Sequence, residues 1–318
     1  MRIPFRLPPH AQRPFDVVGF GLNSIDLLAV VAEYPACDSK QPLQRFARLP
    51  GGEMATAMTA CAKLGWSARY VGSFGDDEFG RLSRESLTDA GVSIEGSRTV
   101  PGAKNQFAVI LVEAVSGRRT ICWDRDPRLI MAPAEVPRDA VVSGRLLVVD
   151  AVQTAAATSA VRAAREAGIP TIIDIDKVRP GTSDLLRSID AIIVAESFLP
   201  AFTGFDDLGR ALEAIAREFD APLVCATLGD EGSLTRVNGR EIRTPAFAVD
   251  TVDTTGAGDA FRGGFASACL ANPEGEIEDV LAYANAVAAL NCRALGARGG
   301  LPTRSEVDGL LSTLDSRR

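Results

Sequence analysis

Histidine is almost absent from this sequence: His10 is the only one in 318 residues. It lies in the proline-broken segment MRIPFRLPPHAQRP, where an irregular tail usually leaves a side chain in solvent. We therefore expect no triad with an imidazole base and no metal site built on histidine ligands. Any proton transfer must then use a carboxylate, lysine, cysteine or tyrosine.

Cysteine pairs and long apolar runs are also missing. The six cysteines are widely spaced without a CxxC pair, which predicts reduced, mostly buried thiols rather than a disulfide framework or a zinc site. No run approaches the roughly 20 apolar residues of a membrane helix, and the N-terminal segment lacks the continuous apolar stretch of a signal peptide. We expect a cytosolic protein without a membrane partner.

Positive charge is in short supply, because 34 Lys and Arg face 41 Asp and Glu and leave a net charge of −7. Such a balance is poorly suited to neutralising nucleic-acid phosphates, so we expect no nucleic-acid partner. Any anionic ligand must be held by a local site.

Apolar strand-like runs alternate with amphipathic segments along most of the chain. FDVVGFG predicts a buried first strand, and from residue 145 the runs RLLVVD, PTIIDID, DAIIVA and APLVCATLGD alternate with helical segments. This order predicts an α/β fold with a mostly parallel central sheet covered by helices on both faces. Residues 106–114 and 119–124, joined by VSGR, predict one hairpin, and Asn238-Gly239 marks the turn of a second. No linker divides the chain, so we expect a single domain over 1–318.

The string DTTGAGDAF, residues 253–261, contains the strongest candidate for chemistry. Its glycines leave backbone N–H groups unobstructed at the predicted start of a helix, where the macrodipole favours an anion. Asp259 falls in the first turn of that helix. One place would therefore combine an anion-binding loop with a carboxylate base.

This string closely resembles the second signature of the ribokinase-like (PfkB) carbohydrate kinase family. The resemblance implies an ATP-dependent kinase in which Gly256, Ala257 and Gly258 form an anion hole and Asp259 is the catalytic base. It also implies a core of about 14–26, 49–105 and 125–314, and a small β-sheet lid built from strands at about 27–48 and 106–124. Lids of this family often pair two subunits, so a homodimer is expected.

Further matches to the family lie on the expected sugar side. Gly51-Gly52 before a helical segment resembles the first signature, in which a glycine pair lets sugar hydroxyls approach the backbone. Thr56 stands where the family usually has Asn and offers one hydrogen-bonding group in place of two amide ends. Asp26 resembles the family residue that grips two substrate hydroxyls, and Gly75-Asp76-Asp77 resembles the GDD loop. Arg125, at the end of the hairpin predicted over the sugar site, is also expected to bind the substrate.

The resemblance also places the nucleotide and its ions. Thr227 and Gly229 resemble the family's phosphate-contacting TxG element, and Asn285 and Ala288 are expected against the adenine. The usual Asn-x-x-Glu of the magnesium site is replaced by Ala195-Glu196-Ser197-Phe198, so Glu196 is a substitute ligand or only an acid at a helix start. We expect Mg²⁺ to be held chiefly by ATP phosphates and water. Asp253 and Thr255 resemble the site that holds K⁺ in some members.

Other interpretations remain beside this one. Arg262 stands where the family more often has Asn, and it is either a buried anion-binding group or a surface residue of the helix. The interpretation as a Rossmann oxidoreductase is weak, because Ser24 replaces the third glycine of the GxGxxG motif after Gly19 and Gly21. A P-loop kinase is weaker still, because the sequence contains no P-loop motif. A nucleoside kinase and a non-catalytic sugar-binding sensor of the same fold remain alternatives.

Overall fold

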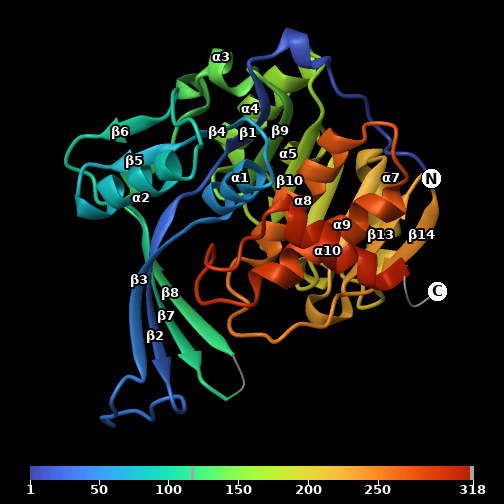
Figure 1. Ribbon diagram of the computed structural model, residues 1–318. Helices are drawn as coiled ribbons and strands as arrows, with labels where there is room; N and C mark the ends of the chain where they lie inside the picture. The colour runs from blue at the N-terminus through green and yellow to red at the C-terminus, as the bar shows by residue number, and fades with distance from the viewer. Residues whose placement is uncertain (116–117, 316–318) are drawn as a thin grey trace.

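A large sheet of eight strands forms the centre of the computed structural model, which describes residues 1–115 and 118–315 (Figure 1). Its strands, in spatial order, are β14 (Arg240–Thr244), β13 (Ser233–Val237), β12 (Leu223–Thr227), β11 (Ala191–Ala195), β10 (Thr171–Ile175), β9 (Gly144–Asp150), β1 (Phe15–Phe20) and β4 (Ala68–Val71). Neighbours from β4 to β12 are parallel, and the β13–β14 hairpin is antiparallel. The predicted mostly parallel sheet and the hairpin at Asn238-Gly239 are confirmed; both turn residues have positive φ.

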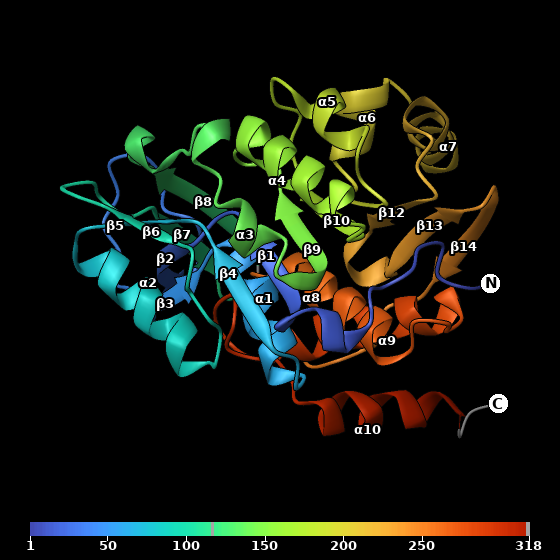
Figure 2. The ribbon, with the colours of Figure 1, turned by 90° about the horizontal axis from the view of Figure 1, so that it is seen from above.

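Helices cover both faces of this sheet (Figure 2). One layer consists of α3 (Arg138–Val141), α4 (Thr154–Glu166), α5 (Thr182–Leu186), α6 (Phe198–Thr203) and α7 (Leu208–Phe219). The other contains α1 (Glu53–Lys63), α8 (Ala257–Ala271) and α9 (Ile277–Asn291), with α10 (Arg304–Asp315) packed outside α9. Strand β9 shows how the faces divide: Leu147 and Val149 pack into the first layer, and Leu146 and Val148 into the second.

Glycines bring α8 very close to its neighbours. A Cβ at Gly263 would lie 2.6 Å from the Cβ of Ala60 in α1, and one at Gly264 would lie 2.9 Å from the Cβ of Val287 in α9. Because glycine alone permits this approach, α8 is held between two helices with no room for a larger side chain at either contact.

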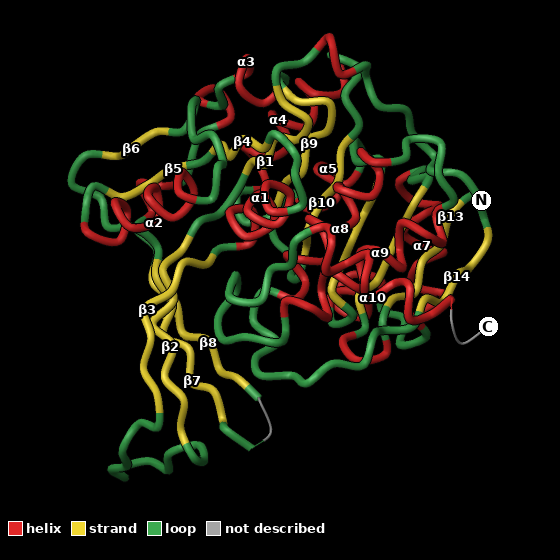
Figure 3. The backbone as a smooth tube through the Cα atoms, in the orientation of Figure 1, coloured by secondary structure: helices red, strands yellow, loops and turns green. Residues whose placement is uncertain are grey.

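A separate small sheet projects from the body, at the lower left of Figure 1 and as the yellow extension of Figure 3. Its spatial order is β3 (Arg45–Gly51), β2 (Ser24–Val31), β7 (Phe107–Glu113) and β8 (Arg119–Asp124), with β2 and β7 parallel. In the turn of the predicted β7–β8 hairpin, residues 116–117 lie outside the described residues. Strand β2 begins at Ser24, earlier than the expected lid boundary, so Asp26 lies within the small sheet.

The remaining elements are short or peripheral. Helix α2 (Glu78–Asp89) packs beside the paired strands β5 (Ser73–Gly75) and β6 (Arg98–Val100). Four 3₁₀ turns lie at His10–Gln12, Pro127–Leu129, Pro133–Glu135 and Gly229–Glu231. Among the helices of the described ranges, none combines the length and hydropathy needed to span a bilayer. Of the six cysteines, all without a disulfide, Cys37 and Cys122 are exposed and the other four are buried as predicted.

Candidate active site

A cavity of about 750 Å³ lies between the carboxyl ends of the central strands, the start of α8 and the small sheet. Asp174, Ala195 and Thr227, at or near the ends of β10, β11 and β12, form its floor. Open parallel sheets commonly bind ligands at this edge. The roof comes from one face of the small sheet, and its lining side chains are Asp26, Ala108, Ile110, Ile121 and Trp123.

The loop before α8 presents backbone donors to this cavity. Gly256 is the N-cap, with φ of 75°, and a Cβ there would lie 2.4 Å from the carbonyl oxygen of Ala297. The N–H of Ala257 already donates to the Thr254 carbonyl at 3.2 Å. Within the described residues, the N–H groups of Gly256 and Gly258 have no acceptor. These two donors and the helix dipole make the loop a candidate anion site.

The carboxylate of Asp259 follows this loop and lines the same cavity. No hydrogen-bond donor among the described residues is bonded to it. Burial raises its pKa well above the ordinary range, and Asp174, Asp26 and Asp150 raise it further, while Arg262 opposes the shift. An unpaired carboxylate with a raised pKa is suited to accepting a proton from a bound hydroxyl.

Among the described residues, four further acids that the sequence interpretation missed lie at the site: Glu53, Asp174 and Asp176 line the cavity, and Asp150 lies next to it. Burial raises the pKa of Asp150 to about 6, although its carboxylate accepts from the N–H groups of Leu22 (2.6 Å) and Val152 (3.0 Å). Burial also raises the pKa of Glu53 well above its usual value. Asp150 and Asp174 are register partners in adjacent parallel strands. Acids near the carboxyl ends of successive strands could have been recognised as a converging group.

On the expected sugar side, Asp26 faces the cavity and accepts from the Ser24 hydroxyl at 3.1 Å. Burial raises its pKa to about 6. Gly52 also lines the cavity, with φ of 91°, and a Cβ there would lie 2.5 Å from the Cα of Asn23. Arg125 is half-buried at the cavity wall, donates to Gln106 Oε1 and lies 5.2 Å from the ring centroid of Trp123.

Gly51 and Thr56 lie behind the cavity wall. Thr56 is fully buried, and its hydroxyl accepts from Nε of Arg298 at 3.2 Å. The Gly51 carbonyl accepts from Nη2 of Arg298 at 2.6 Å, and Nη1 donates to the Ser86 hydroxyl at 3.2 Å. Arg298 thus ties the start of α1 to α2. Sequence reasoning missed this residue, which lies 242 positions from Thr56.

The four expected nucleotide residues, Thr227, Gly229, Asn285 and Ala288, all line the cavity. Thr227 ends β12, and its hydroxyl donates to the Val194 carbonyl at 3.3 Å. Asn285 is buried, and its amide donates to the Ser233 hydroxyl and to the Thr244 carbonyl. These bonds fix α9 against the β13–β14 hairpin at one end of the cavity.

The two expected ion sites differ in their surroundings. Glu196 is exposed and is not part of the cavity lining, and in the described part of the chain no group of three His, Cys, Asp or Glu could hold a metal. Asp253 is fully buried, and its carboxylate accepts from the N–H and hydroxyl of Thr255 and from the N–H of Gly296. Close by, the buried Oδ1 of Asn291 has no donor among the described residues. That oxygen could serve a cation.

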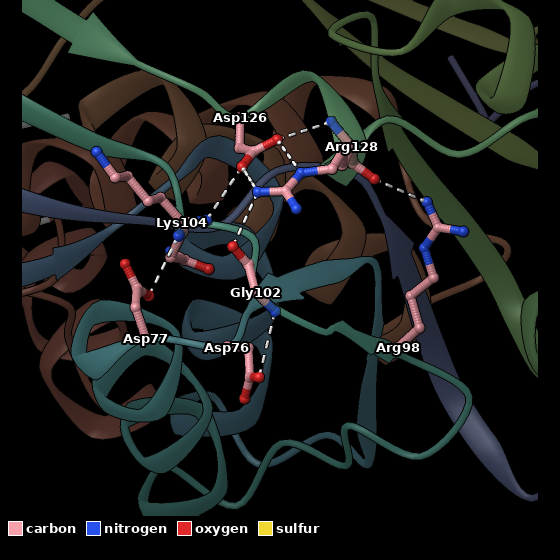
Figure 4. A network of polar contacts seen from close by, with 8 residues as sticks. Asp76, Asp77, Arg98, Gly102, Lys104, Asp126 and Arg128 are labelled. Atoms are coloured by element: carbon pink, nitrogen blue, oxygen red, sulfur yellow. Dashed lines mark hydrogen bonds and ion pairs between the residues drawn. The ribbon is translucent and has the colours of Figure 1, made fainter.

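Besides the bond from Arg298 to Gly51 at the end of β3, hydrogen bonds at both ends of the β7–β8 hairpin fasten the small sheet to the core. Arg119 of β8 donates to the Thr254 hydroxyl at 2.6 Å, beside the glycine loop. At the other end, the Gly75-Asp76-Asp77 loop and Asp126 tie together the segments that enter β7 and leave β8 (Figure 4). The bonds run from Gly102 N–H to Asp76, from Asn105 N–H to Asp77, from Lys104 N–H to Asp126 and from Arg128 to the Gly102 carbonyl.

The chain is similar to known proteins over most of its length. A family model described as pfkB family carbohydrate kinase matches residues 15–304. Fructokinase-1 of Oryza sativa subsp. japonica is 30% identical over 322 residues, covering 93% of this chain and 98% of the rice protein. The ATP-dependent ribose-1-phosphate kinase of Halopiger xanaduensis is 29% identical over 299 residues, with coverages of 93% and 98%. The structure of Arabidopsis thaliana ribokinase complexed with ribose and ATP has a TM-score of 0.80 and 26% identity, and covers 93% of this chain and 98% of that one.

Proposed function

Because the chain belongs to the pfkB family of carbohydrate kinases, we propose that it transfers the γ-phosphoryl group of ATP to a hydroxymethyl group of a small sugar or sugar-like substrate. The observation that carries this proposal is the unpaired carboxylate of Asp259, beside the free N–H groups of Gly256 and Gly258, in a cavity that also contains Asp26. A base, an anion site and a hydroxyl-binding acid meet there within reach of one substrate.

In the proposed reaction, Asp259 takes the proton of the substrate hydroxyl as its oxygen attacks the γ-phosphorus. The N–H groups of Gly256 and Gly258 face the negative charge that develops on the transferring group. Asp26 accepts hydrogen bonds from other hydroxyls of the sugar and orients it. Thr227, Gly229, Asn285 and Ala288 line the part of the cavity that we assign to ATP.

Magnesium neutralises phosphate charge when it is bound with ATP. Since Glu196 is exposed and does not line the cavity, we propose that phosphates and water hold this ion, without the family's usual protein ligands. Potassium is the second ion of the proposal, near Asp253 and Thr255, with Asn291 Oδ1 as an available oxygen. Equal rates in K⁺ and in tetramethylammonium would remove the potassium part alone.

The substrate class remains to be chosen among ketoses, ribose and sugar acids, and a panel assay tests the whole proposal. ADP release would be measured by a coupled assay with ATP and Mg²⁺ against these sugars and against nucleosides. We expect at least one sugar to stimulate ADP release well above the rate with ATP alone. A sugar that binds in calorimetry without causing ADP release would instead identify a sugar-binding sensor. Turnover only with nucleosides would identify a nucleoside kinase in place of a sugar kinase.

We also propose that the small sheet pairs two copies of the chain. On the face opposite Asp26, Phe46 and Val109 are 60% and 39% exposed. Apolar side chains on an exposed sheet face are favourable when another sheet covers them. Light scattering should give a dimer for the unaltered chain and a monomer for Val109→Lys; a monomeric unaltered chain would overturn this part. The expected cytosolic location stays a prediction.

A further inference from the structure

Arg262 is buried at the active-site cavity, which decides between the two interpretations left open by the sequence. The residue is 3% exposed and belongs to the cavity lining. Helical side chains lean toward the N-terminus of their helix, and Arg262 follows this rule. Its Nη1 lies 2.6 Å from the place where a Cβ of Gly258 would stand. The guanidinium therefore sits directly against the glycine loop.

Only part of this guanidinium is satisfied by protein groups. Nη2 pairs with Asp174 Oδ1 at 2.8 Å and donates to the Ile193 carbonyl at 3.3 Å. Nε is buried without a partner, and Nη1 has no acceptor in the described part of the chain. A buried guanidinium with unpaired N–H groups is costly, and a ligand that accepts a hydrogen bond from Nη1 would reduce that cost.

The place of Arg262 in the helix strengthens the need for an anion. Positive charge is unfavourable near a helix N-terminus, where the unpaired N–H groups already present positive charge. Asp174 supplies one compensating carboxylate on the side away from Gly258. Asp259, three residues before Arg262 and on the same helix face, forms no ion pair with it. Nη1 therefore lies against the loop with no protein acceptor, and it is the nitrogen that a ligand in the cavity can reach.

We propose that Arg262 is a catalytic residue that donates a guanidinium N–H to a non-bridging oxygen of the γ-phosphoryl group during its transfer. The sugar oxygen bonds to the γ-phosphorus while the bond from that phosphorus to the bridging oxygen of ATP breaks. The proton of the hydroxyl goes to Asp259, and ADP leaves with the bonding electrons. Arg262 stabilises the charge on the transferring group, together with the loop N–H groups. This inference rests on the kinase function proposed above.

A purely structural role for the Arg262–Asp174 pair predicts different results. If Arg262 only neutralised Asp174, removing both charges would restore a working site. The decisive variants are therefore Arg262→Gln, Arg262→Lys and the double variant Arg262→Gln with Asp174→Asn. Arg145→Gln is a matched control, because Arg145 forms a buried pair with Asp16 at 3.2 Å near the starts of β9 and β1, away from the cavity.

Two measurements are made on each variant: kcat from ADP release with the sugar found active, and binding of a fluorescent ADP analogue with and without aluminium fluoride and sugar. Aluminium fluoride with ADP imitates the transferring phosphoryl group. We expect Arg262→Gln to lower kcat by about 10²-fold or more and to abolish the tighter binding caused by aluminium fluoride, with ADP binding itself unchanged. Arg262→Lys should recover only part of kcat, since one ammonium group cannot both pair with Asp174 and reach the γ-phosphoryl group, as two separate guanidinium nitrogens do. Arg145→Gln should change only thermal stability.

Three results would contradict the proposal: kcat restored in the double variant, kcat within about threefold of the unaltered protein in Arg262→Gln, or an unchanged effect of aluminium fluoride there. If Arg262→Gln fails to fold with Asp174 unpaired, the double variant and Arg262→Lys still give both measurements. An unaltered protein that releases no ADP with any sugar would overturn the proposed function itself, whereas active protein with an active Arg262→Gln would overturn this inference alone.

Discussion

Asp259 is a carboxylate whose ionisation the surroundings oppose. Burial and the neighbouring acids Asp174, Asp26 and Asp150 raise its pKa, so the ionised form is held at a cost in stability at neutral pH. A base that is reluctant to ionise accepts a proton readily. The same property makes its removal informative, because activity and stability should respond in opposite directions.

Asp259→Asn should lower kcat by about 10²–10⁴-fold, since the amide keeps the shape and cannot accept the proton. The thermal midpoint should stay unchanged or rise, because a disfavoured buried charge disappears. The assay is turnover measured beside thermal denaturation, with Asp279→Asn, an exposed first-turn acid of α9, as the control that retains kcat. An active Asp259→Asn would show that the carboxylate is only a helix-terminal acid.

Arg298 should matter to both stability and substrate binding. Arg298→Met removes the guanidinium that donates hydrogen bonds to the Gly51 carbonyl and to the Thr56 and Ser86 hydroxyls. We expect the free energy of unfolding to fall by about 2–4 kcal/mol and KM for the sugar to rise more than kcat falls. Chemical denaturation and steady-state kinetics would test this.

The control for Arg298→Met is Arg293→Met, whose side chain is 44% exposed and pairs with Glu306 at 3.3 Å. Exposed pairs of this kind contribute little, so the stability of this variant should change by less than about 1 kcal/mol. An equal loss of unfolding free energy in both variants would contradict the structural role given to Arg298.

The residues readable from sequence were those whose role is local. Asp259 and Gly256 belong to one short string, and the positive φ of Gly256 is a local property that the glycine itself indicates. Thr56 could be matched to a family position, but its partner Arg298 enters from the far end of the chain. Asp150 and Asp174 lie at or near the ends of two strands that the sequence predicted, but the pairing of β9 with β10 decides that they stand opposite each other.

At the scale of elements, the small sheet was predicted in kind but its pairing was not. The β7–β8 hairpin follows from two short apolar runs and a turn. Strands β2 and β7, in contrast, are parallel neighbours although β2 ends at Val31 and β7 begins only at Phe107. Parallel pairing needs a long connection and leaves no local signal. The early start of β2 follows from that pairing, since Ile25 and Asp26 have partners in β7.

Trp123 should report contact between the roof of the cavity and the substrate. This residue is 58% exposed and lines the cavity, and the guanidinium of Arg125 lies over its ring. Binding of the sugar should shift the tryptophan emission to shorter wavelength as water leaves the ring. The shift should persist in Trp66→Phe, because Trp66 lies near α8 and α10 instead, and vanish in Trp123→Phe. An emission shift that persists in Trp123→Phe would show that Trp123 does not contact the bound sugar.

At the scale of the whole molecule, buried acids should make stability depend on pH. Burial raises the pKa of Asp26 and Asp150 to about 6 and raises that of Glu53, Asp174 and Asp259. Between the ordinary range and these values the folded state binds more protons than the unfolded state. The free energy of unfolding should therefore fall as pH rises from about 5 to about 7.

Urea denaturation at pH 5, 6 and 7 without nucleotide would measure this dependence, and Asp26→Asn should make it less steep. Acids whose pKa is lowered by folding, such as Asp16, change the free energy of unfolding only at a pH below this window, so they do not offset the trend. Stability that is constant or rising over the window would show that these carboxyl groups titrate in their ordinary range.

The architecture of the molecule was the part most accessible from sequence. Short apolar runs such as LLVV in β9 are typical of strands covered on both faces, and their alternation with helices favours a mostly parallel sheet. The relation between the two sheets was less accessible, because contacts such as Arg119 with Thr254 join residues 135 positions apart.

The glycine contacts of α8 have a consequence for how substrate preference can change. Since Gly263 and Gly264 seat α8 against α1 and α9, any replacement there displaces the helix that carries the base. No such close contact restricts the side chains of the roof strand β8: Ile121 and Trp123 are 47% and 58% exposed at the cavity. Directed evolution toward a new sugar should therefore accumulate substitutions in β7 and β8 and leave α8 unaltered, and natural divergence of acceptor choice would follow the same division.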